Sequence, residues 1–112
     1  MKGIIENPDK EEKILKLMGF SSKMGKLIYG KEPLENYLKD NANTMIFLAS
    51  DCSQNTQKLW INKCSYNNAA LFKFTKNTKI EIAQKLGKNE LSAFATDNTD
   101  IIAGIEKILE TK

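Results

Sequence analysis

Apolar and polar residues alternate along the chain in blocks that predict five helices and four strands. Short apolar runs bounded by polar clusters are typical of buried strands. They occupy positions 26–29, 45–49, 69–74 and 91–95. Elsewhere, apolar residues recur every three or four positions, as they do on the inner face of a helix. This spacing predicts helices from about 8 to 24, 31 to 39, 53 to 67, 80 to 86 and 101 to 109.

Capping residues mark several of the predicted helix ends. Asn7-Pro8-Asp9 is a strong start signal, because it combines a capping side chain, a proline at the first helical position and an acid at the positive end of the helix dipole. Pro33 is compatible with the second helix only because it falls in the first turn. Either Ser53 or Asp51 caps the third helix, and the sequence leaves both possibilities open.

Regular alternation of helices and strands predicts an α/β fold in which helices cover both faces of a four-stranded sheet, a three-layer α-β-α sandwich. The length of 112 residues fits one domain over 1–112. In such folds the functional groups usually lie where strands end and helices begin. We therefore expect the polar segment from Asp51 to Thr56 to be a strand-to-helix turn on the functional edge of the sheet.

Composition argues against an enzyme and against a bound cofactor. The chain has no histidine, so neither Cys52 nor the neighbouring serines can pair with an imidazole base. Cys52 and Cys64 are too few for a disulfide scaffold or a zinc site, and we expect two reduced thiols, with Cys64 and Trp60 in the core. The segment Gly19–Lys26 has five residues between its glycines instead of the four of a P-loop, and Leu27 replaces the required Ser or Thr. We expect no catalytic residue, no metal and no cofactor.

Hydropathy gives no indication of a membrane protein. No stretch approaches the roughly 18 to 20 apolar residues of a membrane span, and residues 1–12 lack the apolar run of a signal peptide. These observations lead us to expect a cytoplasmic protein.

Lysines gather in two acid-free segments. Residues 15–31 hold four lysines and residues 52–80 hold five, and neither segment contains an acid, although the net charge is only +3. Such a distribution indicates a polyanionic partner, while a solvated lysine-rich surface is the simpler alternative. Since arginine is absent, any anion would be bound by ammonium or backbone N–H groups.

Three segments carry a resemblance to a known family. These are KILKLMGFSSKMGKLIYG, TMIFLASDCSQNT and IEIAQKLGK. In order and spacing the chain resembles the kink-turn RNA-binding ribosomal proteins of the L-seven-Ae and L-thirty-e type, and within them the small bacterial YlxQ-like members. The similarity runs from about Ile14 to Leu109. It implies a mixed four-stranded sheet and non-catalytic binding of RNA.

The resemblance also implies which residues bind RNA. The start of the second helix would meet guanines of sheared G·A pairs, a loop would supply apolar cover for an extruded nucleotide, and Asp51 corresponds to the acid at a strand end. The implied RNA-binding residues are Lys26, Gly30, Lys31, Glu32, Asn36, Asp51, Ile82 and Ala83. Weaker phosphate contacts are expected from Lys23, Lys76 and Lys79.

The chain departs from the family pattern at two places. Glu32-Pro33 and Asn36 stand where many members have Asn-Glu followed by a lysine one turn later, and Ile82-Ala83 replaces a Leu-Gly pair. Since a lysine and a backbone donor are lost, we expect weaker or differently specific binding than in better-matching relatives.

Two functions of different classes follow. The first is an RNA-binding accessory protein that recognises a kink-turn or another structured RNA such as ribosomal RNA, in association with the ribosome. The second is a protein-interaction module whose basic edge meets an acidic partner. We expect neither DNA nor a membrane as a partner.

Overall fold

The computed structural model describes residues 3–41 and 44–110, in which five strands and five helices alternate. The strands are β1 (Gly3–Ile5), β2 (Leu27–Tyr29), β3 (Met45–Leu48), β4 (Ala70–Phe74) and β5 (Ala93–Thr96). The helices are α1 (Pro8–Lys23), α2 (Lys31–Asp40), α3 (Gln54–Tyr66), α4 (Lys79–Leu86) and α5 (Thr99–Glu110). Every predicted helix and strand is therefore present, with bounds that differ by a few residues at most.

All five strands form one mixed sheet in the order β1-β4-β3-β5-β2. β1 and β3 run parallel to β4, whereas β5 runs antiparallel to both β3 and β2. The expectation of four strands was wrong in one respect, because residues 3–5 add the edge strand β1. Its three residues are too few to show a periodic pattern, and only Ile5 among them is buried.

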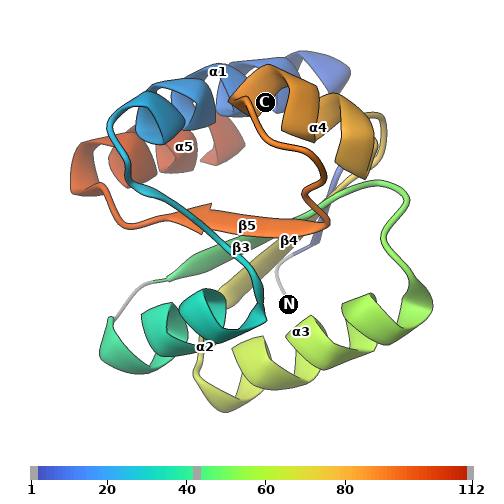
Figure 1. Cartoon of the computed structure of the whole chain (residues 1–112), viewed down its shortest axis with the longest axis vertical. Coiled ribbons are helices and arrows are strands. Elements are labelled where there is room, and N and C mark those ends of the chain that lie inside the picture. The colour runs from blue at the N-terminus through green and yellow to red at the C-terminus, as the bar shows by residue number, and fades with distance from the viewer. Residues whose placement is uncertain (1–2, 42–43, 111–112) are drawn as a thin grey trace.

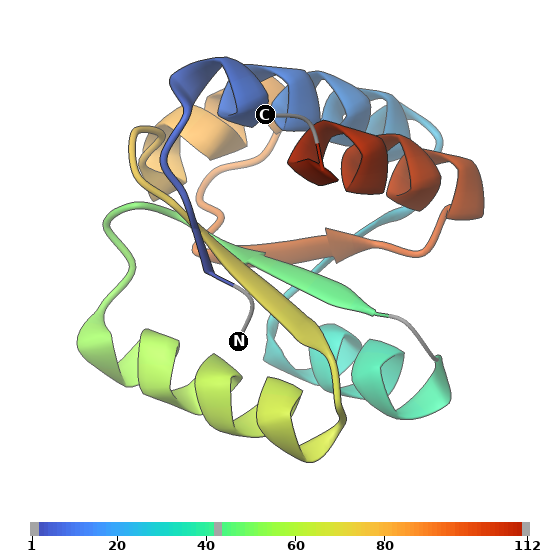
Figure 2. The same ribbon diagram turned by 180° about the vertical axis from the view of Figure 1, so that it is seen from behind.

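Helices cover both faces of the sheet, as expected for a three-layer sandwich. α1, α4 and α5 lie on one face, and α2 and α3 lie on the other (Figures 1 and 2). Side chains of alternate strand residues point to opposite faces of the sheet and form a core on each face. Phe47, Phe74 and Phe94 pack under α1, α4 and α5, and their ring centroids lie 5.8–6.0 Å apart. Ile46 and Leu71 face the other side, toward α2 and α3.

The strands bring several chain turns to one end of the sheet. Because β3 and β4 are parallel, they end at the same edge, and the antiparallel β5 begins there, with Leu48 opposite Ala93. β2 also ends there, since Tyr29 pairs with Phe94. We call this region, residues 29–33, 50–56, 75–79 and 88–92, the strand-end edge. It contains the N-termini of α2, α3 and α4 and confirms that Asp51 to Thr56 is a strand-to-helix turn on that edge.

Candidate functional site

The first turn of α2 is exposed and has no cap. Its N-cap residue Gly30 has φ +89° and ψ 150°, a conformation that favours glycine, and no side chain accepts a hydrogen bond from this helix end. Leu34 N–H is bonded to the Gly30 carbonyl at 3.1 Å, and Pro33 has no N–H. The N–H groups of Lys31 and Glu32 are thus left without a partner in the described residues.

A shallow hollow of about 190 Å³ adjoins this helix end. Gly30 and Lys31 of the α2 tip line it together with Thr56 of α3 and Ser92 at the start of β5. Asn36 is exposed one turn further along α2. Glu35 forms an ion pair with Lys63, and the hydrogen bond from that ammonium holds the pKa of Glu35 below its ordinary value. This neighbouring acid is therefore already paired.

Asp51 does not cap α3; it binds the first turn of α4, whose N-cap is Thr78. Its Oδ1 accepts a hydrogen bond from the N–H of Lys79 at 2.8 Å, across 28 positions of sequence. The cap of α3 is Ser53, whose hydroxyl accepts from Thr56 N–H at 3.1 Å. Asp51 therefore fastens the end of β3 to the start of α4, and one of its carboxylate oxygens is engaged within the chain.

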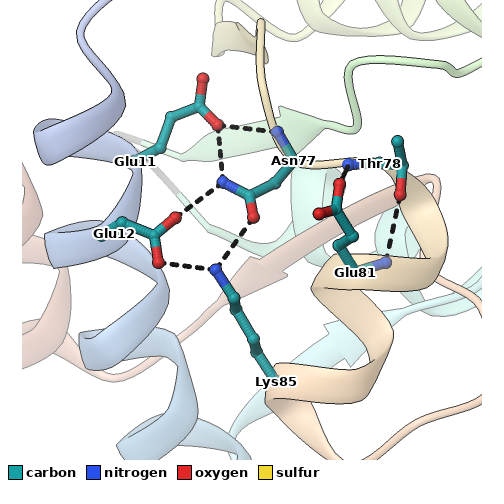
Figure 3. A network of polar contacts seen from close by, with 6 residues as sticks. All are labelled: Glu11, Glu12, Asn77, Thr78, Glu81 and Lys85. Carbon is teal, nitrogen blue, oxygen red and sulfur yellow. Dashed lines mark hydrogen bonds and ion pairs between the residues drawn. The ribbon is translucent and has the colours of Figure 1, made fainter.

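A buried acid of α1 holds the loop between β4 and α4 (Figure 3). Glu11 is 0% exposed, and its carboxylate accepts hydrogen bonds from three consecutive backbone N–H groups, those of Thr75, Lys76 and Asn77, at 2.7–3.0 Å. Burial raises the pKa of this carboxyl, but hydrogen bonds from Asn77, Thr75 and Lys76 together hold it below its ordinary value. Hydrogen bonds to the buried Glu11 carboxylate therefore fix the loop that carries Lys76.

Further contacts extend this network to the surface. The Asn77 side chain donates to Glu12 at 3.0 Å and accepts from Lys85 Nζ at 3.0 Å, while Lys85 also bonds to Glu12 at 2.6 Å (Figure 3). The hydrogen bonds from Lys85 and Asn77 lower the pKa of Glu12. α1, the loop and α4 are consequently tied together beside the strand-end edge.

Neither Glu11 nor Asn77 was singled out in the sequence. A signal was nevertheless present: Glu11 precedes Ile14, Leu15 and Met18 at helical spacing, so it falls on the inner stripe of α1. A charged residue at such a position needs several hydrogen bonds inside the fold.

The expected lysines do not all lie on the strand-end edge. Lys31 and Lys76 are exposed on this edge. Lys79 also lies on it, but its Nζ is paired with Glu90 Oε1 at 3.5 Å. Lys23 and Lys26 come just before β2, at the opposite end of that strand from Gly30. A lysine that was not predicted, Lys88, lies on the edge, with its Nζ 5.1 Å from the ring centroid of Tyr29.

The predicted apolar cover is not provided by Ile82 and Ala83. Both are 0% exposed, since they belong to α4 and pack into the core against α1 and the sheet. Side chains buried in this way cannot touch a nucleotide in this conformation. The exposed apolar side chain of this segment is Ile80, which is 50% exposed in the first turn of α4.

The strand-end edge offers donors and positive charge, and two of its acids have partners. Asp51 accepts from Lys79 N–H, and Glu90 faces the Lys79 amine, whereas Glu32 is exposed in the first turn of α2. Glu81, just beyond the edge, accepts from Thr78 N–H at 3.0 Å in a capping box. Among residues 3–41 and 44–110, no three His, Cys, Asp or Glu side chains form a group that could hold a metal ion. Within the same ranges, no helix is long and apolar enough to cross a membrane. The arrangement is suited to binding an anion.

Comparisons with known proteins show similarity in sequence and in structure. The chain is 32% identical over 82 residues to the RNA-binding protein YlxQ of Enterococcus faecium, an alignment that covers 73% of this chain and 78% of that protein. No protein-family model matches the chain.

Two solved structures share the fold. A protein of unknown function from Bacillus halodurans superposes with a TM-score of 0.74 at 20% identity, covering 88% of this chain and 98% of that one. A 15.5 kDa RNA-binding protein from Giardia lamblia gives a TM-score of 0.73 at 10% identity, covering 94% and 88%. At these identities the structures show the fold alone.

Proposed function

The chain belongs to the YlxQ family, and we propose that it binds structured RNA, without catalysis, through the strand-end edge. The observation that carries this proposal is the exposed, uncapped start of α2. Two unpaired N–H groups and the positive end of the helix dipole favour an anionic or carbonyl oxygen, and Gly30 allows a close approach.

The side chains around this tip supply the remaining chemistry of RNA binding. Lys31 meets a phosphate, and the Asn36 amide, one turn along, can both donate to and accept from a base edge. Lys76 and Lys88 extend the positive surface along the edge, and the Asp51 to Lys79 bond keeps the β3 and α4 segments in place. Phosphate contacts of this kind position the RNA, and hydrogen bonds from the α2 tip to its base edges recognise it.

A kinked RNA is the form of structured RNA that we propose for this site. The residues that carry the resemblance to kink-turn-binding proteins include the β2–α2 segment, and in the structure that segment ends in an exposed helix start. A sharply bent backbone exposes phosphates and base edges to such a protruding tip, whereas a regular A-form duplex keeps its major-groove base edges in a deep, narrow groove. Association with the ribosome and a cytoplasmic location belong to the same proposal.

Binding to two RNAs tests the proposal. Fluorescence anisotropy would compare a kink-turn RNA with a duplex in which Watson–Crick pairs replace the bulge and the G·A pairs, from about 50 to about 200 mM salt. We expect tighter binding of the kink-turn at every salt concentration. Equal affinity for both RNAs would contradict recognition of the kink. If the protein bound neither RNA, RNA binding itself would be contradicted.

Paired variants then test the location of the site. The double variant K31Q/N36A removes the two side chains at the start of α2, and K39Q/N62A removes the same residue types from the far end of α2 and from α3. We expect the first to weaken kink-turn binding by about 1 to 3 kcal/mol and the second to leave it nearly unchanged. If K31Q/N36A abolishes capture of an acidic protein and leaves RNA binding intact, the edge serves a protein partner instead.

A further inference from the structure

A second hollow lies outside the strand-end edge, between the C-terminal half of α1 and the end of α4. It measures about 750 Å³, and the buried side chains of Leu15 and Leu86 contribute to its lining. Phe20 lines it and is 48% exposed. The hydroxyl of Ser22 donates to the Leu86 carbonyl at 2.8 Å, so the two helices that form the walls are bonded to each other. We call this hollow the α1–α4 groove.

The charge on the α1–α4 groove is positive. Lys16, Lys23 and Lys85 line it, and the acid among the lining residues, Glu12, already bonds to Lys85 at 2.6 Å and to the Asn77 amide at 3.0 Å. Lys16 and Lys23 are exposed. A half-exposed aromatic ring between lysines is the arrangement with which proteins bind single-stranded nucleic acid, because any base can stack on the ring while the ammonium groups follow the phosphates.

Adjacent and contacting residues link the α1–α4 groove to the strand-end edge. Gly87 lines the groove and ends α4, the next residue, Lys88, lies over the Tyr29 ring, and Tyr29 directly precedes Gly30. β2, which contains Tyr29, is an edge strand of the sheet, so this strip is not covered by a further strand. An RNA bound at the α2 tip can therefore pass over Tyr29 and Lys88 into the groove.

We propose that an unpaired flank of the bound RNA enters the α1–α4 groove, where a base stacks on Phe20 and Lys16 and Lys23 contact phosphates. This inference rests on the proposed RNA binding at the strand-end edge and extends it. It gives a role to Lys23, which lies away from that edge. It also predicts that affinity depends on nucleotides outside the kinked core.

The test compares a kink-turn core with the same core carrying an unpaired extension of about six nucleotides, a length within the span that one binding site covers. We expect the extension to raise the affinity of the wild-type protein about five- to tenfold. The variants F20A and K16Q/K23Q should lose this gain and keep the affinity for the core. F20Y, which retains a ring, should keep the gain.

A stacking signal separates contact from an indirect effect. With 2-aminopurine in the extension, the wild type and F20Y should quench its fluorescence, while F20A should not. An unchanged melting temperature of F20A would show that the fold is retained. If the core binds but the extension adds nothing, or if F20A weakens the core and the extended RNA equally, the inference is overturned while the proposed function stands.

An acidic amphipathic peptide provides the remaining arm of the experiment. If it shifts the amide signals of Phe20 and Gly87 in an NMR titration while the extended RNA leaves them in place, the groove serves a protein partner, and the inference fails. If the wild type does not bind the core at all, the failure lies in the proposed function itself.

Discussion

Glu11 of α1 binds Asn77, 66 positions later in the chain, through two hydrogen bonds to one carboxylate oxygen. The backbone N–H of Asn77 lies 3.0 Å from Oε1 and its side-chain amide nitrogen lies 2.8 Å from the same atom. Oε2 accepts from the preceding two backbone N–H groups. A buried carboxylate thus accepts hydrogen bonds from three consecutive backbone N–H groups and fixes the loop that carries Lys76.

Replacing Glu11 by Gln should destabilise the protein strongly. The substitution removes the charge and turns one acceptor into an NH₂ group that faces backbone donors, so we expect a loss of about 2 to 4 kcal/mol in the free energy of unfolding. The control is Glu12→Gln, a partly exposed neighbour, for which we expect a loss below about 1 kcal/mol. Urea denaturation measures both, and equal losses would contradict the role assigned to Glu11.

Stability should depend on pH through Glu11. Its hydrogen bonds hold its pKa in the folded protein below the ordinary value of 4.5. A carboxyl with a lowered pKa contributes stability that is fully present above that ordinary value and is lost as the pH falls through the folded pKa. We expect the free energy of unfolding to decrease on acidification from pH 5 to pH 3, and E11Q to show a shallower decrease. Parallel curves for the two proteins would refute this assignment.

Gly30 should tolerate no side chain without strain. At φ +89° and ψ 150° the backbone is accessible essentially to glycine alone, and a Cβ there would meet Pro33 Cδ only at an ordinary 3.6 Å. Gly30→Ala should therefore cost about 1 to 3 kcal/mol through backbone conformation, and it should weaken RNA binding.

Gly19 provides the matched control for Gly30. It lies inside α1, where a Cβ meets nothing within 4 Å, so Gly19→Ala should stabilise the protein by about 0.5 to 1 kcal/mol. Thermal unfolding of the two variants checks both signs. A neutral Gly30→Ala would mean that the β2–α2 turn relaxes to another conformation in solution.

Both cysteines should be unreactive in the native protein. Cys52 and Cys64 are free and buried, and burial raises the pKa of both thiols, that of Cys64 to about 11. Because the thiolate is the reactive form, we expect slow labelling by a thiol reagent at pH 8 and rapid labelling of both residues in denaturant. Rapid labelling of the folded protein would show that its core opens easily.

Much of the fold was predictable because its helices and strands have strong local signals. Each predicted helix and strand was found, and Trp60 and Cys64 are in the core as expected. β1 was missed because three residues carry no periodicity and the strand depends on pairing with the distant β4. Which helix Asp51 binds was likewise not predictable, since its partner Lys79 lies 28 positions away.

The candidate site was predictable only in part. The exposed start of α2 follows from Gly30 and the preceding strand, which are local features. Burial of Ile82 and Ala83 depends on which face of α4 packs against α1 and the sheet. In the structure that orientation leaves Ile80 as the exposed apolar residue of the segment. The role of Glu11 could not be predicted, because it depends on three backbone N–H groups that converge on its carboxylate from the loop after β4.

The most direct test of the central claim follows the backbone amides of the α2 tip while RNA is added. In a ¹⁵N–¹H NMR titration with a kink-turn RNA, we predict that the largest shifts occur at Gly30, Lys31 and Glu32, whose N–H groups lie at the uncapped helix start. Residues of α5, which lies on the other face of the sheet from α2, should change little. Large shifts in α5 with an unchanged α2 tip would contradict the account.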